Sequence, residues 1–118
     1  MNRQTYYKLE GHKPIPCNFD DPDYMGIWKD EIRRVGLDEW MGIKISTVFL
    51  VINHNWGDGP PVLFETMIFG GPLDETIERY CTWEEAEEGH KRLVQKVHNI
   101  GFWKMLWWRI LCIFGKKE

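Results

Sequence analysis

The centre of the chain carries its clearest hydrophobic pattern, in which two apolar runs and a shorter charged run are separated by turn residues. The first run, 43–54, is rich in β-branched and aromatic residues and is apolar on both faces, as in a strand that is buried on two sides. Asp58-Gly59 supplies turn chemistry before a second run over 61–70, and a Gly-Gly-Pro turn precedes a third run over 75–81. The pattern predicts a three-stranded antiparallel meander with both faces covered.

A long helix is expected directly after the meander. Thr82 and Glu85 have the spacing of a capping box, in which each side chain binds a free main-chain amide at the helix start. Gly89 permits close approach of a neighbouring element, and Gly101 is placed to end the helix. We therefore predict a helix over 83–99 that packs on the meander. Its apolar positions share one side of the helix: Ala86, Leu93, Val94, Val97 and Ile100.

The N-terminal part is richer in proline and acidic residues. Residues 1–22 predict an extended arm with at most one short strand near 6–9. Asp23 is placed to cap a helix over 24–35, and Gly36 is placed to end it. We expect the arm and this helix to cover the face of the sheet away from the long helix. The apolar residues of the predicted helix are Met25, Trp28 and Ile32.

The C-terminal part contains the longest apolar run. Residues 102–114 are apolar except for Lys104 and Arg109, and a helix that is apolar nearly all round is buried or lies at a membrane surface. About 13 residues are too few to cross a bilayer, which takes roughly 20. We predict a subunit contact, and hence a homo-oligomer; the alternatives are a peripheral membrane contact and docking on a partner protein. The predicted interface residues are Trp103, Leu106, Trp107, Ile110 and Phe114.

Together these elements predict an α+β fold: a small antiparallel meander of three to four strands packed by one long helix, with a short N-terminal helix and an apolar C-terminal helix. A chain of 118 residues fits one domain. Within it we distinguish an extended arm over 1–22, an α+β core over 23–101 and an aromatic C-terminal helix over 102–118.

Composition narrows the class of function. The net charge of −3 argues against general nucleic-acid binding, which needs a clustered excess of Lys and Arg. The three cysteines are widely spaced, so we predict neither a disulfide framework nor a zinc site. His90 and His98 stand about 12 Å apart along a helix, too far to share one ion, so no metal is predicted. No cofactor motif is present, and the polar N-terminus lacks a signal segment, which favours a cytoplasmic protein.

The expected strand register gathers a candidate ligand site. If the first hairpin folds about Gly57 and Asp58, Leu50 faces Glu65; if the second folds about Pro72, Glu65 faces Arg79. One interpretation is a structural ion pair between Glu65 and Arg79.

The other interpretation is that these residues form a binding site. Arg79 would hold a phosphate or carboxylate bidentately, oriented by Glu65, beside the imidazole of His54. Trp56 and Tyr80 would stack on a base or ring. These five residues form the predicted ligand site, and no catalytic residue is assigned.

A small hydrolase is a further alternative. It would use His54 or His90 as a general base with Glu65 as the partner carboxylate, because such chemistry needs an imidazole within hydrogen-bond reach of a carboxylate. For His90 and His98, the simpler interpretation is a surface histidine with its hydrogen bonds satisfied.

The chain resembles a family of small uncharacterised proteins of bacteriophages and prophages over about residues 6 to 97. The matching motifs are Gly11-His12-x-Pro14-Ile15-Pro16, the segment 28–35, Ser46-Thr47-Val48-Phe49-Leu50, His54-Asn55, Gly57-x-Gly59-Pro60-Pro61, Leu63-Phe64-Glu65-Thr66-Met67-Ile68-Phe69, Arg79-Tyr80 and Thr82-Trp83-Glu84-Glu85-Ala86-Glu87-x-Gly89-His90. The resemblance implies a phage origin, and the helix from Phe102 looks like an addition to the pattern.

Small acidic phage proteins without catalytic motifs often act on the host by binding, and by analogy with them we expect a protein that counters host antiviral defence by binding. Its partner would be a small nucleotide that serves as an immune signal, sequestered at the predicted ligand site. The alternative is inhibition of a host defence protein through the aromatic C-terminal helix. Both readings favour a non-enzymatic accessory protein.

Overall fold

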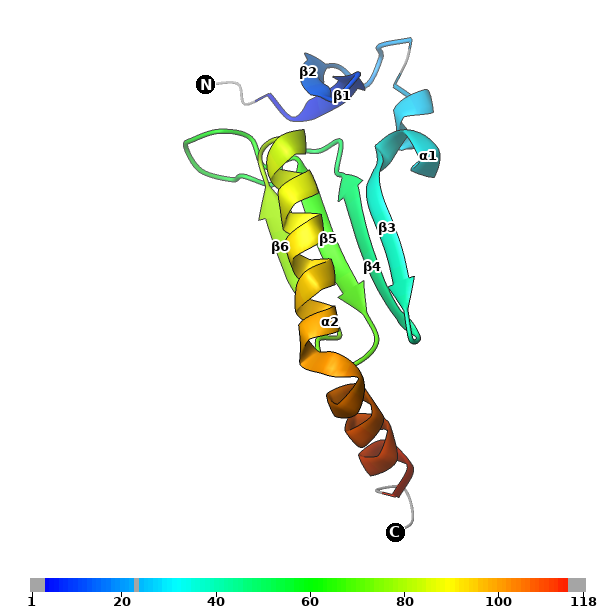
Figure 1. The fold of residues 1–118 in the computed structure, drawn as a ribbon. Helices are drawn as coiled ribbons and strands as arrows, with labels where there is room; N and C mark the ends of the chain where they lie inside the picture. Colours follow the sequence, from blue (N-terminus) through cyan, green and yellow to red (C-terminus); the bar gives the residue numbers. More distant parts are fainter. Residues whose placement is uncertain (1–3, 23, 115–118) are drawn as a thin grey trace.

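A four-stranded antiparallel sheet in the order β3-β4-β5-β6 forms the centre of the fold, and the helix α2 lies across one face of it (Figure 1). The computed structural model describes residues 4–22 and 24–114. The sheet and the long helix together confirm the predicted α+β class. A second sheet, of two strands, was not predicted. The elements are β1 (Tyr6–Glu10), β2 (Lys13–Cys17), the 3₁₀ helix η1 (Gly26–Trp28), α1 (Asp30–Arg33), β3 (Arg34–Trp40), β4 (Ile43–Phe49), β5 (Phe64–Phe69), β6 (Ile77–Tyr80) and α2 (Trp83–Phe114).

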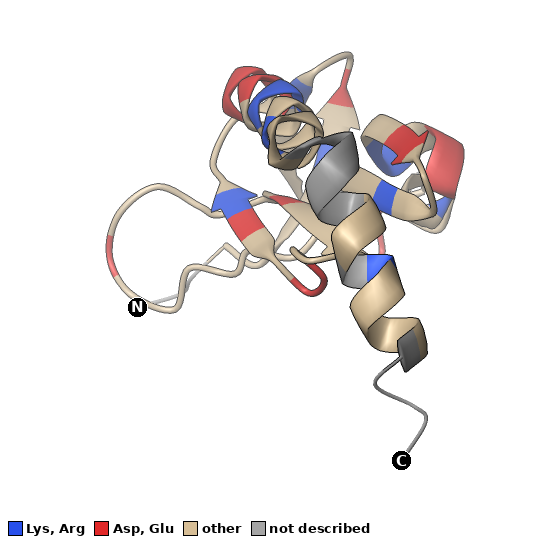
Figure 2. Ribbon diagram, turned by 60° about the horizontal axis from the view of Figure 1, so that its bottom comes forward, with Lys and Arg blue, Asp and Glu red and all other residues tan. Residues whose placement is uncertain are grey.

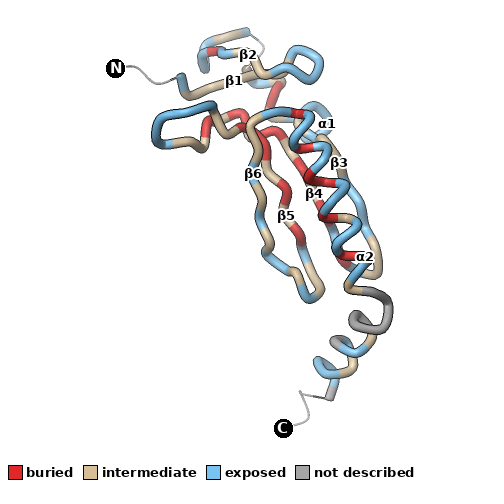
Figure 3. The backbone as a smooth tube through the Cα atoms, turned by 60° about the vertical axis from the view of Figure 1, so that its left-hand side comes forward, coloured by how far each residue is buried: buried red, intermediate tan, exposed pale blue. Residues whose placement is uncertain are grey.

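The covered face of the sheet contains the core. Residues of β4 alternate strictly between buried and more exposed positions, as expected of a strand with one covered face. Buried residues alternate with less buried ones along the two central strands, β4 and β5 (Figure 3). On β4 and β5 the buried residues are Ile43, Ile45, Thr47, Phe49, Phe64, Thr66 and Ile68, and α2 contributes Ala86, Leu93 and Val97.

The prediction that both faces of the sheet are covered is wrong. Leu37, Phe69 and Ile77 are exposed, and the strand pairing places them with Val48 and Met67 on the face away from α2. We call this side of the sheet the open face and the side under α2 the covered face. The face stays open because the segment that was expected to cover it forms other structure.

Part of that segment becomes an additional strand, so the predicted helix over 24–35 is wrong. Only η1 and the four-residue α1 are helical, and the chain from Arg34 pairs with β4 as β3. Met41 and Gly42 both have positive φ, 50° and 81°, as a tight two-residue hairpin requires. Gly36 lies within β3 at a register shift instead of ending a helix. The predicted cap Asp23 lies outside the described residues.

The N-terminal arm is also more structured than predicted. The short strand expected near 6–9 is present as β1, but it pairs with β2 in a hairpin. This hairpin lies at the end of the sheet beside the start of α2 (Figure 1). There His12 stacks on Trp83 with ring centroids 3.9 Å apart, and Cys17 is buried in the same cluster as Phe49.

The predicted strand over 43–54 is divided between the two sheets. β4 ends at Phe49, and Val51 has a φ of 71°, a left-handed conformation that β-branched residues rarely adopt. Beyond this break the chain follows β1: the amide of Tyr7 donates to the Val51 carbonyl at 2.8 Å, and the amide of Asn53 donates to the Thr5 carbonyl at 2.9 Å.

The register between β4 and β5 differs from the prediction by two residues. Val48, not Leu50, is opposite Glu65, because residues 50–63 form a longer loop than a tight turn at Gly57 and Asp58. In this loop the Asn53 Oδ1 accepts from the amides of Asn55 and Val62, at 2.8 and 3.0 Å. A shift of two keeps each residue on its predicted face. The predicted pairing of Glu65 with Arg79 is confirmed.

The start of α2 is as predicted and its end is not. The amide of Glu85 donates to the Thr82 Oγ1 at 3.0 Å, and the Glu85 Oε1 accepts from the amide of Thr82 at 3.2 Å, which completes the capping box. The helix continues through Gly101 to Phe114 and projects beyond the sheet (Figure 1). A glycine inside a helix costs only about 1 kcal/mol, so it need not end one. Among the described residues, no helix is long and apolar enough to cross a membrane.

Gly89 allows β6 and α2 to approach, so Gly89→Ala should destabilise the fold. A Cβ there would lie 2.3 Å from the Tyr80 hydroxyl oxygen, and overpacking typically costs about 1–3 kcal/mol. The middle of this range, about 2 kcal/mol, exceeds the gain of about 1 kcal/mol in helix propensity. Chemical denaturation should show a lower free energy of unfolding, whereas the control Gly26→Ala, with open space around its Cβ, should not. Equal stability of the two variants would contradict the packing argument.

Candidate functional site

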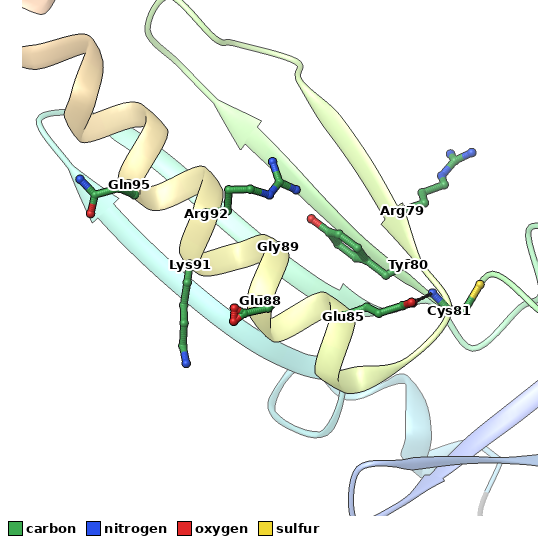
Figure 4. Close-up of a pocket in the computed structure, with 9 residues that line it drawn as sticks. All are labelled: Arg79, Tyr80, Cys81, Glu85, Glu88, Gly89, Lys91, Arg92 and Gln95. Atoms are coloured by element: carbon green, nitrogen blue, oxygen red, sulfur yellow. Dashed lines mark hydrogen bonds between the residues drawn. The ribbon is translucent and has the colours of Figure 1, made fainter.

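A groove of about 860 Å³ lies between β6 and the first half of α2 (Figure 4). Its position follows from local structure, because β6 is an edge strand and the capping box starts α2 directly beside it. In Figure 4 Arg92 and Tyr80 point toward each other, while Lys91 points away from them. The lining residues are Arg79, Tyr80, Cys81, Glu85, Glu88, Gly89, Lys91, Arg92 and Gln95.

Tyr80 forms the inner side of the groove. Its ring packs against Gly89, and its hydroxyl lies 3.1 Å from the Thr66 Oγ1 and 3.2 Å from the Glu78 Oε1. Burial raises the pKa of the Tyr80 phenol; the hydrogen bond with Thr66 opposes this, and the negative charge of Glu78 adds to it. The phenol is therefore protonated at neutral pH and has one hydrogen to donate.

Arg92 is held at the groove by a carboxylate of β6. It donates two hydrogen bonds to Glu78, one of them from Nη1 to Oε2 at 3.1 Å, in the bidentate geometry that guanidinium and carboxylate groups favour. These hydrogen bonds lower the pKa of Glu78, although burial raises it in part. They also raise the pKa of Arg92.

Arg79 borders the groove, but its side chain points away from Arg92 and Tyr80 (Figure 4). Its Nε donates to the Glu65 Oε2 at 2.9 Å, with 48% of the Arg79 side chain and 19% of the Glu65 side chain exposed. The predicted ion pair between these two residues is therefore present. Because successive strand residues face opposite sides, Arg79 lies on the open face and Tyr80 on the covered face.

The cysteine in the groove is not an activated nucleophile. Burial raises the pKa of the Cys81 thiol, and the nearby Glu85 carboxylate raises it further. A thiol needs a lowered pKa to react as the thiolate at neutral pH. Cys81 therefore contributes a neutral thiol to the groove wall.

The structure does not bring all five predicted ligand residues together. Glu65, Arg79 and Tyr80 are neighbours on β5 and β6, but His54 and Trp56 belong to the 50–63 loop, which contributes no lining residue to the groove. The His54 Nδ1 binds the Ile52 carbonyl at 2.8 Å, and Trp56 is 78% exposed.

The structure does not bring together two of the predicted hydrolase residues, His90 and Glu65. His90 is buried on the covered face, whereas Glu65 lies on the open face. The carboxylate that contacts His90 is Asp38, whose Oδ1 lies 2.7 Å from Nε2. The interpretation of His90 as a surface residue is wrong, although its hydrogen bonds are satisfied. His98 is exposed and lies against Trp40.

Polar side chains form a continuous row between the sheet and α2, which the sequence did not predict. The His90 Nδ1 lies 2.6 Å from the Thr47 Oγ1, and the Thr47 Oγ1 lies 2.5 Å from the Thr66 Oγ1. Thr66 in turn contacts the Tyr80 hydroxyl. We call Asp38, His90, Thr47, Thr66, Tyr80 and Glu78 the polar row. The predicted register paired Thr47 with Ile68, and β3 was not expected. The contacts of Thr47 with Thr66 and of Asp38 with His90 could therefore not be predicted.

The described residues in the projecting end of α2 are mostly uncharged (Figure 2), and several of them have exposed apolar side chains. Trp107, Leu111 and Ile113 are 62%, 54% and 64% exposed, while Leu106 and Ile110 are half-buried. The Arg109 Nη2 donates to the Met41 carbonyl at 2.5 Å, which holds the projection to the β3–β4 turn. The side chains of two predicted interface residues, Trp103 and Phe114, lie outside the described residues.

No protein-family model, curated protein or solved structure matches this chain. Within 4–22 and 24–114, no group of three or more His, Cys, Asp or Glu side chains could hold a metal ion. The geometry of the groove is therefore the basis for a functional assignment.

The Glu78–Arg92 pair should make a pH-dependent contribution to stability. Because the pKa of Glu78 is lowered in the folded state from its ordinary value of 4.5, the contribution is present above that value. It is lost as the pH falls through the lowered pKa. Glu78→Gln should reduce the free energy of unfolding at pH 7 by about 0.5 kcal/mol, a small effect because the pair is partly exposed.

Denaturation titrations at pH 7 and pH 3 should show that the difference between wild type and Glu78→Gln shrinks in acid. The control Glu88→Gln removes an exposed carboxylate from the same groove and should show a smaller difference at pH 7. A Glu78→Gln effect of the same size at both pH values would contradict this role of the ion pair.

Proposed function

We propose that this protein binds a small anionic ligand with a ring, such as a nucleotide, in the groove and releases it unchanged. The observation that carries the proposal is that Arg92 and the aromatic side chain of Tyr80 point toward each other in one groove, which Arg79 borders from β6 (Figure 4). Arginine is suited to bidentate recognition of phosphate and carboxylate. Aromatic side chains provide stacking surfaces for bases.

Each arginine is already positioned by a carboxylate. Glu65 orients Arg79, and Glu78 orients Arg92. An anionic ligand would share or displace these carboxylates, which lowers the net gain from each new contact. The proposal therefore implies binding that depends mainly on the guanidinium group of Arg92 and weakens at high salt.

Binding without turnover is favoured by the chemistry of the groove. Its lining residues include no histidine, serine or threonine, and the Cys81 pKa is raised. A histidine base paired with a nucleophile is therefore not found among the described lining residues. In the setting that the resemblance to phage proteins implies, the ligand is a nucleotide signal of host immunity, and the protein acts by sequestering it.

Arg92→Ala should weaken nucleotide binding by about tenfold or more, because it removes a charged, bidentate contact. Arg79→Ala should weaken binding less, because the Arg79 guanidinium lies on the open face with Glu65. Purified protein would be incubated with a panel of cyclic and ADP-ribose-type nucleotides, and the supernatant analysed by chromatography before and after heat denaturation. A ligand should disappear and return intact. The control Arg34→Ala removes an exposed arginine outside the groove and should bind as wild type does. Return of an altered nucleotide, or no depletion by wild type, would overturn the proposal.

A second candidate function is protein interaction through the projecting end of α2. The specific observation is the exposure of Trp107, Leu111 and Ile113 on one short segment, because large exposed apolar groups that lie together mark interaction sites. A second copy of this chain, and hence a homo-oligomer, remains the first expectation; a host defence protein or a membrane surface is the alternative.

Trp107→Glu should convert the predicted oligomer to a monomer, because burying an unpaired charge in an apolar contact is strongly unfavourable. Light scattering after size-exclusion chromatography would measure the mass of each species. The control Lys96→Glu changes charge on the exposed side of α2 within the part that covers the sheet, and should leave the mass unchanged. A monomeric wild-type protein would rule out self-association through this segment.

A further inference from the structure

The polar row crosses the covered face of the sheet without a gap. It begins at Asp38 on β3, passes through His90 of α2 to Thr47 on β4 and Thr66 on β5, and ends at β6. Successive polar atoms are 2.7, 2.6, 2.5 and 3.1 Å apart up to the Tyr80 hydroxyl. Tyr80 also contacts Glu78, which binds Arg92 at the groove.

The direction of each hydrogen bond is determined by the protonation state of His90. An ionised Asp38 only accepts, so the His90 Nε2 carries a hydrogen in either state. When His90 is neutral, Nδ1 must accept from Thr47. Thr47 then accepts from Thr66, and Thr66 accepts from Tyr80. In this state Tyr80 donates toward the interior, and Glu78 accepts from Arg92 alone.

Protonation of His90 reverses the row. Nδ1 then donates to Thr47, Thr47 donates to Thr66, and Thr66 donates to the Tyr80 oxygen. The Tyr80 hydrogen must then point to the Glu78 Oε1, the atom 3.2 Å away that also accepts from Arg92. Both states satisfy every buried group, as buried polar groups require. Hydroxyl rotation alone connects them.

We propose that the polar row links the protonation of His90 to the Glu78–Arg92 pair at the groove. When His90 is protonated, Tyr80 shares the Glu78 oxygen with Arg92, and the guanidinium becomes more available to an anion. Acidification should therefore tighten anion binding, and by reciprocity a bound anion should favour protonated His90. The effect on binding rests on the proposed function of the groove; the link between His90 and Tyr80 does not.

The surroundings of His90 support this assignment. Asp38 is the charged group in contact with the ring; 53% of its side chain is exposed, against 9% of His90, so protons exchange with solvent at that end. Thr47 and Thr66 are fully buried and neutral. From β6 the facing charged group is Glu78 with its partner Arg92. On α2, Glu87 one turn before His90 is exposed.

The link is tested by following the titration of His90 by NMR in the full-length protein. Tyr80→Phe and Thr66→Val each remove one hydroxyl without changing the charge. When His90 is protonated, the hydroxyl that precedes the deleted one in the row then has no acceptor for its hydrogen. The titration midpoint of His90 should fall by about half a pH unit or more in each variant. The midpoint of the exposed His98 should not move, and the matched control Tyr24→Phe should leave both midpoints unchanged.

An unchanged His90 midpoint in a folded Tyr80→Phe or Thr66→Val variant would overturn the proposal, as would a His90 that does not titrate in the folded protein. A second measurement uses sulfate, whose charge is constant over the range. Wild type should bind sulfate a few-fold more tightly at pH 5.5 than at pH 7.5, and Thr66→Val should lose most of this difference. If His90 shifts as expected but sulfate does not bind, the link stands and the proposed anion site is at fault.

Discussion

The burial of His90 beneath the sheet is the constraint on which the arrangement of the other elements depends. A buried imidazole is costly unless both ring nitrogens have partners. Asp38 and Thr47 supply them from two neighbouring strands, so α2 can occupy only one position along the sheet. Gly36 leaves room for the ring, because a Cβ at that position would lie 2.8 Å from it.

The polar row also explains how the core is divided. One buried apolar cluster includes Phe49, Phe64 and Trp83 beside the β1–β2 hairpin. The other includes Ile45, Ile68, Leu93 and Val97 toward the projecting end of α2. The side chains of Thr47 and Thr66 lie between them on the two central strands. Two small apolar clusters supply the non-directional stabilisation, while the row supplies the directional contacts that determine how the strands and helix align.

This arrangement separates the two candidate functions in space. The groove lies beside the first half of α2, where Gly89 and His90 bring the helix close to β6 and β3. The projecting end of α2 begins after the helix leaves the sheet and carries Trp107, Leu111 and Ile113. A variant of one surface can therefore leave the other intact, and ligand binding and self-association can be measured independently.

Local signals in the sequence were enough for several elements. The capping box at Thr82 and Glu85, the apolar periodicity of α2, the close approach at Gly89 and the pairing of Glu65 with Arg79 depend on residues that are close in the sequence or joined by a short turn. Such features follow from hydrogen bonding and side-chain periodicity over a few residues. The α+β class followed from these features together.

The remaining features were decided by contacts between distant parts of the chain. β3 forms because β4 offers it an edge, and the predicted strand over 43–54 breaks at Val51 because β1 competes for its second half. Those events set the register that pairs Thr47 with Thr66 and brings Asp38 to His90, 52 residues away. The sequence by itself determined which segments are apolar, where α2 begins and that β4, β5 and β6 pair in that order. The tertiary structure alone decided the polar row and the groove, because hydrogen bonds between side chains on five different elements leave no periodic signal along the chain.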